Sequence, residues 1–235
     1  MTASALAPPE RTSVPIARSP MPTPGFPPTA LDSAGDPIWV SDLASVEPNH
    51  TLHVVKGLEP AEALEVLGAN PRLFRTCELP DAKADVWSSL VGKALGIEPG
   101  DSAALLAGRI GAWTFVYDDA GFTSPGPHTI SLSADGSTAA SSLDTINADA
   151  SLSYAVNGEE LAFVDVNDLD LGADLPGMPA ELRAAFDAAG VFDDEDIAPG
   201  EVDHAIGMRV VCALAGLVCT LDDLRRITLT GVPFG

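Results

Sequence analysis

The sequence predicts an α+β domain in which an antiparallel sheet of about four or five strands is covered by helices on one face. Segments with the alternating apolar pattern of strands lie in the middle of the chain, and segments with apolar residues at helical spacing dominate its last third. Between two alternating runs stand Asn157 and Gly158. This pair favours a type I′ turn, because both central residues of that turn need positive φ, and it therefore predicts a β-hairpin.

Residues 1–36 are predicted to form a disordered Pro-rich tail. They contain eight of the 20 prolines and show no apolar periodicity. Such a segment cannot bury enough surface to offset the entropy cost of ordering it. Residues 37–235 belong to a chain that is 46% hydrophobic, which is enough for one sizeable core. We therefore expect one α+β domain over residues 37–235.

The first predicted elements are a strand over residues 51–56 and a helix that begins at Pro60. The strand segment is rich in β-branched residues and alternates in polarity. Pro60 suits the first turn of a helix, where its missing N–H costs nothing. Leu64 and Leu67 then mark a buried face, and Gly68 ends the helix.

A second helix and a second strand follow. The helical pattern places Trp87 and Leu95 on one buried side, with Gly96 just after the last apolar position. Residues 110–117 are aromatic and β-branched, which is typical of a strand, and Asp118 begins the turn after it.

The hairpin strands are predicted over residues 151–156 and 161–166, and helices are predicted over 179–189 and 201–219. A short last helix begins at Thr220, because threonine is a good N-cap residue. Acidic residues follow in its first turn and arginines in its last turn, and both placements suit the helix dipole.

Four segments together resemble a known family. They are Trp39–Leu43, Thr51–Leu64, Gly111–Trp113 and Tyr154–Gly158. This set is similar to an uncharacterised domain family common in high-GC, actinobacterial-type bacteria and catalogued as a domain of unknown function. The resemblance covers about Trp39 to Leu224 and departs from the family pattern between Ser137 and Asp149, where an aromatic-rich strand is expected. It implies fold boundaries and brings no known activity or catalytic residues.

Composition and charge exclude several classes of partner. The net charge of −22 repels phosphate backbones, and no basic patch interleaved with aromatic residues is present, so nucleic-acid binding is disfavoured. The longest apolar run, residues 210–218, is well short of the ~20 residues that a bilayer requires. Prolines and arginines interrupt residues 1–31, which therefore lack a secretory signal pattern. We expect a cytoplasmic protein without a membrane partner or a cofactor.

Nucleophilic catalysis is disfavoured by the sequence, and we assign no catalytic residues. The nucleophile-elbow, phosphate-loop and zinc-protease motifs are missing. Ser141, His128 and Asp144 are the right residue types for a triad, but they lie in a polar region where hydroxyl groups commonly bond to turns. His50 and His53 bracket the start of a strand, and their odd spacing sends them to opposite faces. No metal site is predicted from them.

Two groups of carboxylates remain as candidates for metal or acid–base chemistry. Asp118 and Asp119 precede Gly121, which is ordinary turn chemistry. Residues 165–170 are Asp-rich, but an EF-hand loop beginning at Asp165 would have Asp170 in place of its glycine and Pro176 in place of its last glutamate. We interpret the segment as a solvated acidic loop. A metal-dependent hydrolase that combines these carboxylates is the alternative function.

The acidic stretch from Asp165 to Asp203 carries the leading functional hypothesis. It has twelve acidic residues and a single Arg, a net charge of −11. Such a surface favours a basic protein partner through electrostatic steering, as in an inhibitor, an immunity-type protein or an adaptor. Ordinary solubility is the competing explanation of the charge. The predicted partner-binding residues are Phe192, Asp193, Asp194, Glu195 and Asp196.

Overall fold

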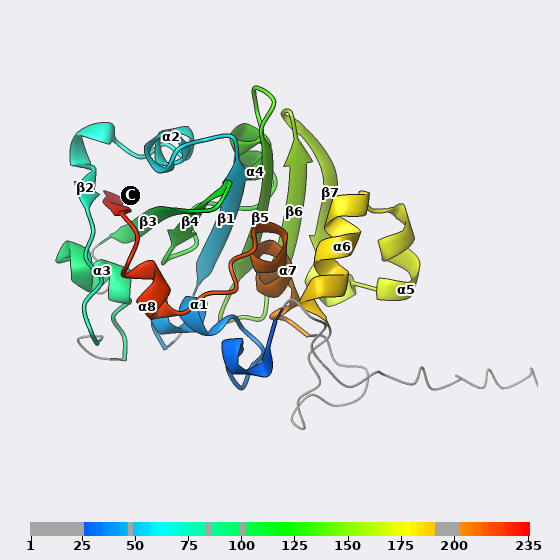
Figure 1. Ribbon diagram of the computed structural model, residues 1–235, viewed down its shortest axis with the longest axis horizontal. Coiled ribbons are helices and arrows are strands. Elements are labelled where there is room, and N and C mark those ends of the chain that lie inside the picture. Colours follow the sequence, from blue (N-terminus) through cyan, green and yellow to red (C-terminus); the bar gives the residue numbers. More distant parts are fainter. Residues whose placement is uncertain (1–25, 47–48, 83–85, 99–101, 191–202) are drawn as a thin grey trace, which may run out of the picture.

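The computed structural model describes residues 26–46, 49–82, 86–98, 102–190 and 203–235. Eight of its segments are strands of one sheet (Figure 1). The strands are β1 (His50–Lys56), β2 (Arg75–Thr76), β3 (Ala103–Ile110), β4 (Trp113–Asp118), β5 (Thr138–Asp144), β6 (Ala150–Val156), β7 (Glu159–Asp165) and β8 (Leu229–Phe234). The α-helices are α1 (Ile38–Leu43), α2 (Pro60–Val66), α3 (Leu90–Leu95), α4 (Pro127–Leu132), α5 (Leu171–Asp174), α6 (Ala180–Ala189), α7 (Ile206–Ala215) and α8 (Leu221–Leu224).

The strand order is β2-β8-β3-β4-β1-β5-β6-β7, and every neighbouring pair is antiparallel. The α+β class and the antiparallel sheet are therefore confirmed, but the prediction of four or five strands is wrong. The segment predicted as one strand over 110–117 spans the turn of a hairpin. Gly111, with φ of 60°, lies in that turn, β3 ends before it and β4 begins after it.

Helices cover both faces of the sheet, which corrects the prediction of one covered face. Helices α1, α3, α6, α7 and α8 pack on one face, and α2 and α4 pack on the other. Successive strand residues point to opposite faces, so Val54 lies in the first core and Val55 in the second. A sheet buried on both faces has near-continuous apolar strands, which is why β3 lacks the alternation that sequence reasoning requires.

Several local predictions are confirmed. Helix α2 begins at Pro60, and Leu64 and Leu67 are buried, as predicted; the structure adds a capping box between Glu59 and Glu62. Gly96 ends α3 in the left-handed conformation that glycine adopts easily. Trp87, however, is 59% exposed and lies before the helix, so its predicted burial is wrong.

The predicted hairpin is β6 and β7. Asn157 and Gly158 have φ of 52° and 78°, as a type I′ turn requires. The pairing between the two strands shifts register at Tyr154 and Ala155. Helix α6 follows the prediction closely, whereas α7 is shorter than the predicted 201–219 and ends where Gly216 adopts φ of 67°.

Residues 26–36 contact the rest of the protein, which corrects the tail boundary at residue 36. Phe26 and Leu31 are 1% and 8% exposed and belong to the larger core. Asp32 accepts a hydrogen bond of 2.6 Å from the hydroxyl of Ser41 in α1. Two large apolar residues thus anchor a Pro-rich segment that shows no periodicity. Residues 1–25, the rest of the predicted tail, lie outside the described residues.

Candidate functional site

The predicted partner-binding residues Phe192, Asp193, Asp194, Glu195 and Asp196 lie outside the described residues. The positions on either side of that gap are described, and both are bonded to Arg209. Its guanidinium donates to the carbonyl oxygen of Gly190 at 3.2 Å and forms an ion pair with both carboxylate oxygens of Asp203. It also donates to the carbonyl oxygen of Gly35 at 2.8 Å, so one fully buried cation joins three distant segments.

Within the described part of the acidic stretch, the surface is hollowed beside β7. The hollow has a volume of about 390 Å³, and we call it the β7 groove. Its lining residues are Ala162, Phe163, Val164, Asp165, Asp168, Asp174 and Met178.

The groove combines an apolar floor with an acidic rim. Val164 and Met178 are nearly buried, whereas Phe163 is 56% exposed. The three carboxylates that line the groove are exposed, and among the described residues no basic side chain pairs with them. A groove that is lined by an exposed aromatic residue and by unpaired charge of one sign is typical of an interaction surface.

Local hydrogen bonds explain how the chain builds the rim. Asp165 accepts the N–H of Asn167 at 3.0 Å. Asp170 caps α5 by accepting the N–H groups of Gly172 and Ala173, and Asp174 accepts the N–H of Asp170 at 2.9 Å. The carboxylates therefore order the chain between β7 and α6, as Asx turns and caps do.

Charge around the groove is strongly negative beyond its lining. Between residues 159 and 190 there are eight acidic residues and one basic residue, Arg183. The Arg183 guanidinium donates to the carbonyl oxygens of Pro176 and Met178, so it does not neutralise the carboxylates of the rim. Tyr154 donates to the Glu181 carboxylate at 2.9 Å. The field at the groove therefore favours cationic groups.

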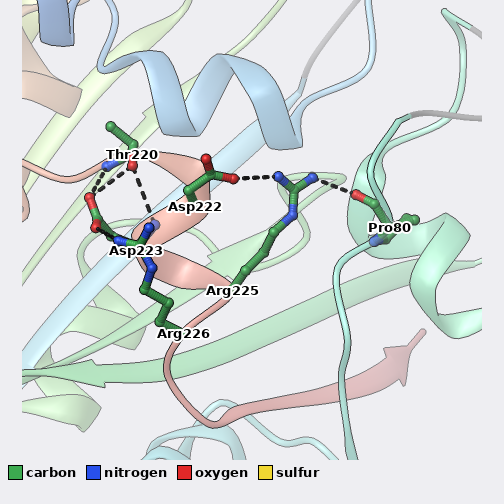
Figure 2. Close-up of polar contacts among 6 residues, drawn as sticks. All are labelled: Pro80, Thr220, Asp222, Asp223, Arg225 and Arg226. Carbon is green, nitrogen blue, oxygen red and sulfur yellow. Dashed lines mark hydrogen bonds and ion pairs between the residues drawn. The ribbon is translucent and has the colours of Figure 1, made fainter.

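A second hollow of about 400 Å³ lies near α8. Its lining residues are Ile38, Asp42, Asp81, Ala82, Leu90, Thr220, Leu221, Asp222 and Arg225. Figure 2 shows the polar contacts beside it. The Arg225 guanidinium donates to Asp222 at 2.8 Å and to the carbonyl oxygen of Pro80 at 2.7 Å. These contacts join α8 to the segment after β2, so the hollow contains a structural ion pair.

Thr220 caps α8 as predicted. Its hydroxyl accepts the N–H of Asp223, and the Asp223 carboxylate accepts the N–H of Thr220 in return (Figure 2). Hydrogen bonds from this cap and the nearby Arg226 hold the pKa of the Asp223 carboxyl below its usual range.

The carboxylates of the alternative hydrolase are not brought together. Asp118 is fully buried and accepts the N–H and the hydroxyl of Thr123 at 2.7 and 2.6 Å, which is the predicted turn chemistry. Asp119 accepts the N–H of Ala104 at 2.6 Å, and burial raises the pKa of its carboxyl to about 6. Three strands separate β4, which ends at Asp118, from β7, which ends at Asp165. Among the residues described, no group of three or more His, Cys, Asp or Glu side chains is placed to hold a metal ion.

Ser141, His128 and Asp144 do not form a triad. Ser141 instead lies opposite His53 in the β1–β5 pairing, and its Oγ is 2.6 Å from His53 Nδ1. Sequence reasoning missed this contact because β5 was not recognised as a strand. His50 lies on the other face, with its Nδ1 3.1 Å from the Tyr117 hydroxyl, so the predicted separation of the two histidines is confirmed.

Five side chains form a directed chain of hydrogen bonds around His53, which we call the His53 network. The hydroxyl of Thr129 donates to Ser141, and the hydroxyl of Thr123 donates to Asp118. His53 Nε2 lies 2.8 Å from the Thr123 oxygen, whose proton is already engaged. Nε2 must therefore carry the ring proton, and Nδ1 accepts from Ser141.

The His53 network is closed to solvent. Asp118, Thr123, His53, Ser141 and Thr129 are all 0% exposed. Burial, with a smaller effect from His128, lowers the pKa of His53 to about 3, so the ring is neutral. A serine bonded to a neutral histidine resembles a nucleophile and its base, but substrate has no access to it here. The network acts as a satisfied polar layer between the sheet and α4.

The fold and the β7 groove together define a class: an antiparallel-sheet α+β protein with an acidic groove at one edge of the sheet. Residues 30–220 match a family of unknown function (DUF6461), and the chain belongs to this family. The predicted resemblance to a domain family of unknown function is thereby confirmed. No curated protein and no solved structure matches the chain. None of the helices in the described ranges is long and apolar enough to cross a membrane.

Proposed function

We propose that the protein is a non-enzymatic interaction module whose acidic surface around the β7 groove binds a basic protein. Inhibitors, immunity-type proteins and adaptors use this mode of binding. The observation that supports the proposal most directly is the β7 groove, which is lined by the exposed Phe163 and by three carboxylates that have no basic partner among the described residues. Opposite charge accelerates the encounter, and burial of the aromatic ring then holds the complex.

The competing explanation of the charge, solubility alone, accounts for exposed carboxylates but not for Phe163. Trp87 and Phe122 are exposed to a similar degree, and what distinguishes Phe163 is its place in a groove lined by carboxylates. Phe192 to Asp196 belong to the same acidic stretch of the sequence, and the proposal includes them as a second contact region.

Removing the rim charge is expected to weaken binding selectively. In the groove variant, Asp165, Asp168 and Asp174 are each changed to Asn, which keeps an acceptor oxygen for the local hydrogen bonds. We expect association with a basic partner to slow about tenfold at low salt, because steering depends on charge. Capture from host lysate by the tagged full chain at low and high salt identifies the partner, and stopped-flow kinetics with that purified partner give the rate.

A matched control separates local charge from net charge. The control variant carries Glu65→Gln, Glu78→Gln and Asp81→Asn. These changes also remove three negative charges, but from exposed positions outside the β7 groove. This control variant is expected to bind at close to the original rate. A separate variant with Asn or Gln at positions 193–196 tests the second region. Equal association rates for the original chain, the groove variant and the 193–196 variant would refute the proposal.

A further inference from the structure

Strand β7 forms one edge of the sheet. β7 has seven residues and stands last in the strand order, and its only strand partner in the described chain is β6. The opposite edge of the sheet is β2, which has only two residues. An edge strand presents backbone N–H and C=O groups that can pair with another extended chain. β7 is therefore the longer of the two edges available for such pairing.

The register locates the part of β7 that can accept a neighbour. The irregularity at Tyr154 and Ala155 lies opposite residues 160–162, and a bulge there disrupts regular pairing. From Ala162 to Asp165 the pairing with β6 is regular. The β7 groove opens along this same segment, since Ala162, Phe163, Val164 and Asp165 all line it.

The negative charge along β7 determines which kind of chain can pair with its edge. A second copy of this chain would place the carboxylates of Glu160 and Asp165 against another set of carboxylates, and like charges on adjacent strands repel. Asp168 and Asp174, on the other side of the groove, add to the same field. A basic segment is attracted by each of these carboxylates. The groove is therefore complementary to a basic strand and not to a second copy of this chain.

We propose that the segment Ala162–Asp165 of β7 pairs with an extended basic segment of the partner, which joins the sheet as an added strand. This inference rests on the proposed function and specifies how the partner binds. Strand addition supplies main-chain hydrogen bonds, and side chains at alternate positions of the added strand provide specificity.

The alternation of β7 predicts the pattern of the added strand. Glu160, Phe163 and Asp165 share one face of the sheet, according to their pairing with β6, and Ala162 and Val164 share the other. Lys or Arg residues of the partner lie on the first face, where they contact the Phe163 ring and the carboxylates of Glu160 and Asp165. Small apolar residues lie on the second face, beside Met178. The partner segment is thus an alternation of basic and apolar residues.

A synthetic peptide tests the inference on the full-length protein. The probe alternates Lys and Val over about eight residues, about 26 Å when extended. A matched peptide has the same side chains but carries N-methyl groups on two adjacent central residues, which removes one donor from each of its edges. Affinity is measured by fluorescence anisotropy at low salt, and backbone amide exchange is measured by NMR with and without peptide.

We expect the unmodified peptide to bind at least about tenfold more tightly than the N-methylated peptide, because only the former can complete the ladder of hydrogen bonds. Amides within residues 162–165 should become protected from exchange, and the groove variant should bind the unmodified peptide more weakly than the control variant.

Two other outcomes overturn strand addition. Equal binding of both peptides without amide protection would mean that charge alone attracts them, and the proposed function would stand. Failure of both peptides to bind at low salt would also refute strand addition. The proposed function would then be decided separately, by comparing the groove and control variants against the captured partner.

Discussion

Replacing His53 with Ala is expected to lower the free energy of unfolding by about 3–5 kcal/mol. The ring is fully buried and bonds to Ser141 on one side and Thr123 on the other. Its removal leaves a cavity and takes away a partner from each of two buried hydroxyl groups, so the packing and desolvation costs combine. Urea denaturation of the full chain measures the change.

Two further variants serve as controls for the His53→Ala measurement. His128→Ala removes a more exposed imidazole whose Nδ1 bonds to the backbone of Ser124, and its cost should stay below about 1 kcal/mol. His53→Gln keeps a donor and an acceptor in a smaller side chain and should recover part of the loss. If His53→Ala costs no more than His128→Ala, the network does not stabilise the core as its geometry indicates.

The elements predicted correctly from sequence are those with local determinants. Pro60 in the first turn of α2, the left-handed Gly96 after α3 and the Asn157–Gly158 turn are each encoded within a few residues. Such signals act through neighbouring residues and do not depend on contacts with distant parts of the chain. They gave correct positions for α2, α3 and the β6–β7 hairpin, although Trp87 before α3 was expected to be buried.

Strands without local signals were missed because contacts distant in sequence determine them. β5 consists largely of small residues, and its buried Ser141 is bonded to His53 in β1 and Thr129 in α4. β8 contains Gly231 and Pro233, residue types that disfavour strands. Gly231 is needed there, since an added Cβ would lie 2.8 Å from a Leu95 methyl carbon and 3.1 Å from the Cβ of Cys77. No pattern within β8 reveals that requirement.

The negative charge of the candidate site was predicted from the sequence, but the groove beside β7 was not. The acidic stretch contains Asp165, Asp168 and Asp174, which line the β7 groove. Phe163 was assigned only to a hairpin strand, because nothing in the sequence shows that β7 is the last strand of the sheet. The available signal was an aromatic residue two positions before the acidic stretch begins. Its importance depends on strand order, which is set by packing of the whole chain.

Asp36 is expected to make the protein less stable as pH rises from about 4 to about 7. One carboxylate oxygen of Asp36 is buried without a hydrogen-bond partner. Burial raises the pKa of this carboxyl to about 7, and the negative charges of Asp144, Asp32 and Asp203 add to the rise, while Arg209 opposes it. The folded state therefore holds a proton that the unfolded state releases near pH 4.

The sign of the effect follows from this difference in proton binding. The stability that protonated Asp36 contributes is complete below pH 4 and is lost as pH rises to 7, so Asp36→Asn should match the original chain near pH 4. Near pH 8 the variant should be more stable by about 2–4 kcal/mol, from a rise of about three pKa units at 1.36 kcal/mol each. Urea denaturation at both pH values measures this, with Asp42→Asn as the exposed control. A difference between Asp36→Asn and the original chain that is the same at pH 4 and pH 8 would show that Asp36 does not hold this proton.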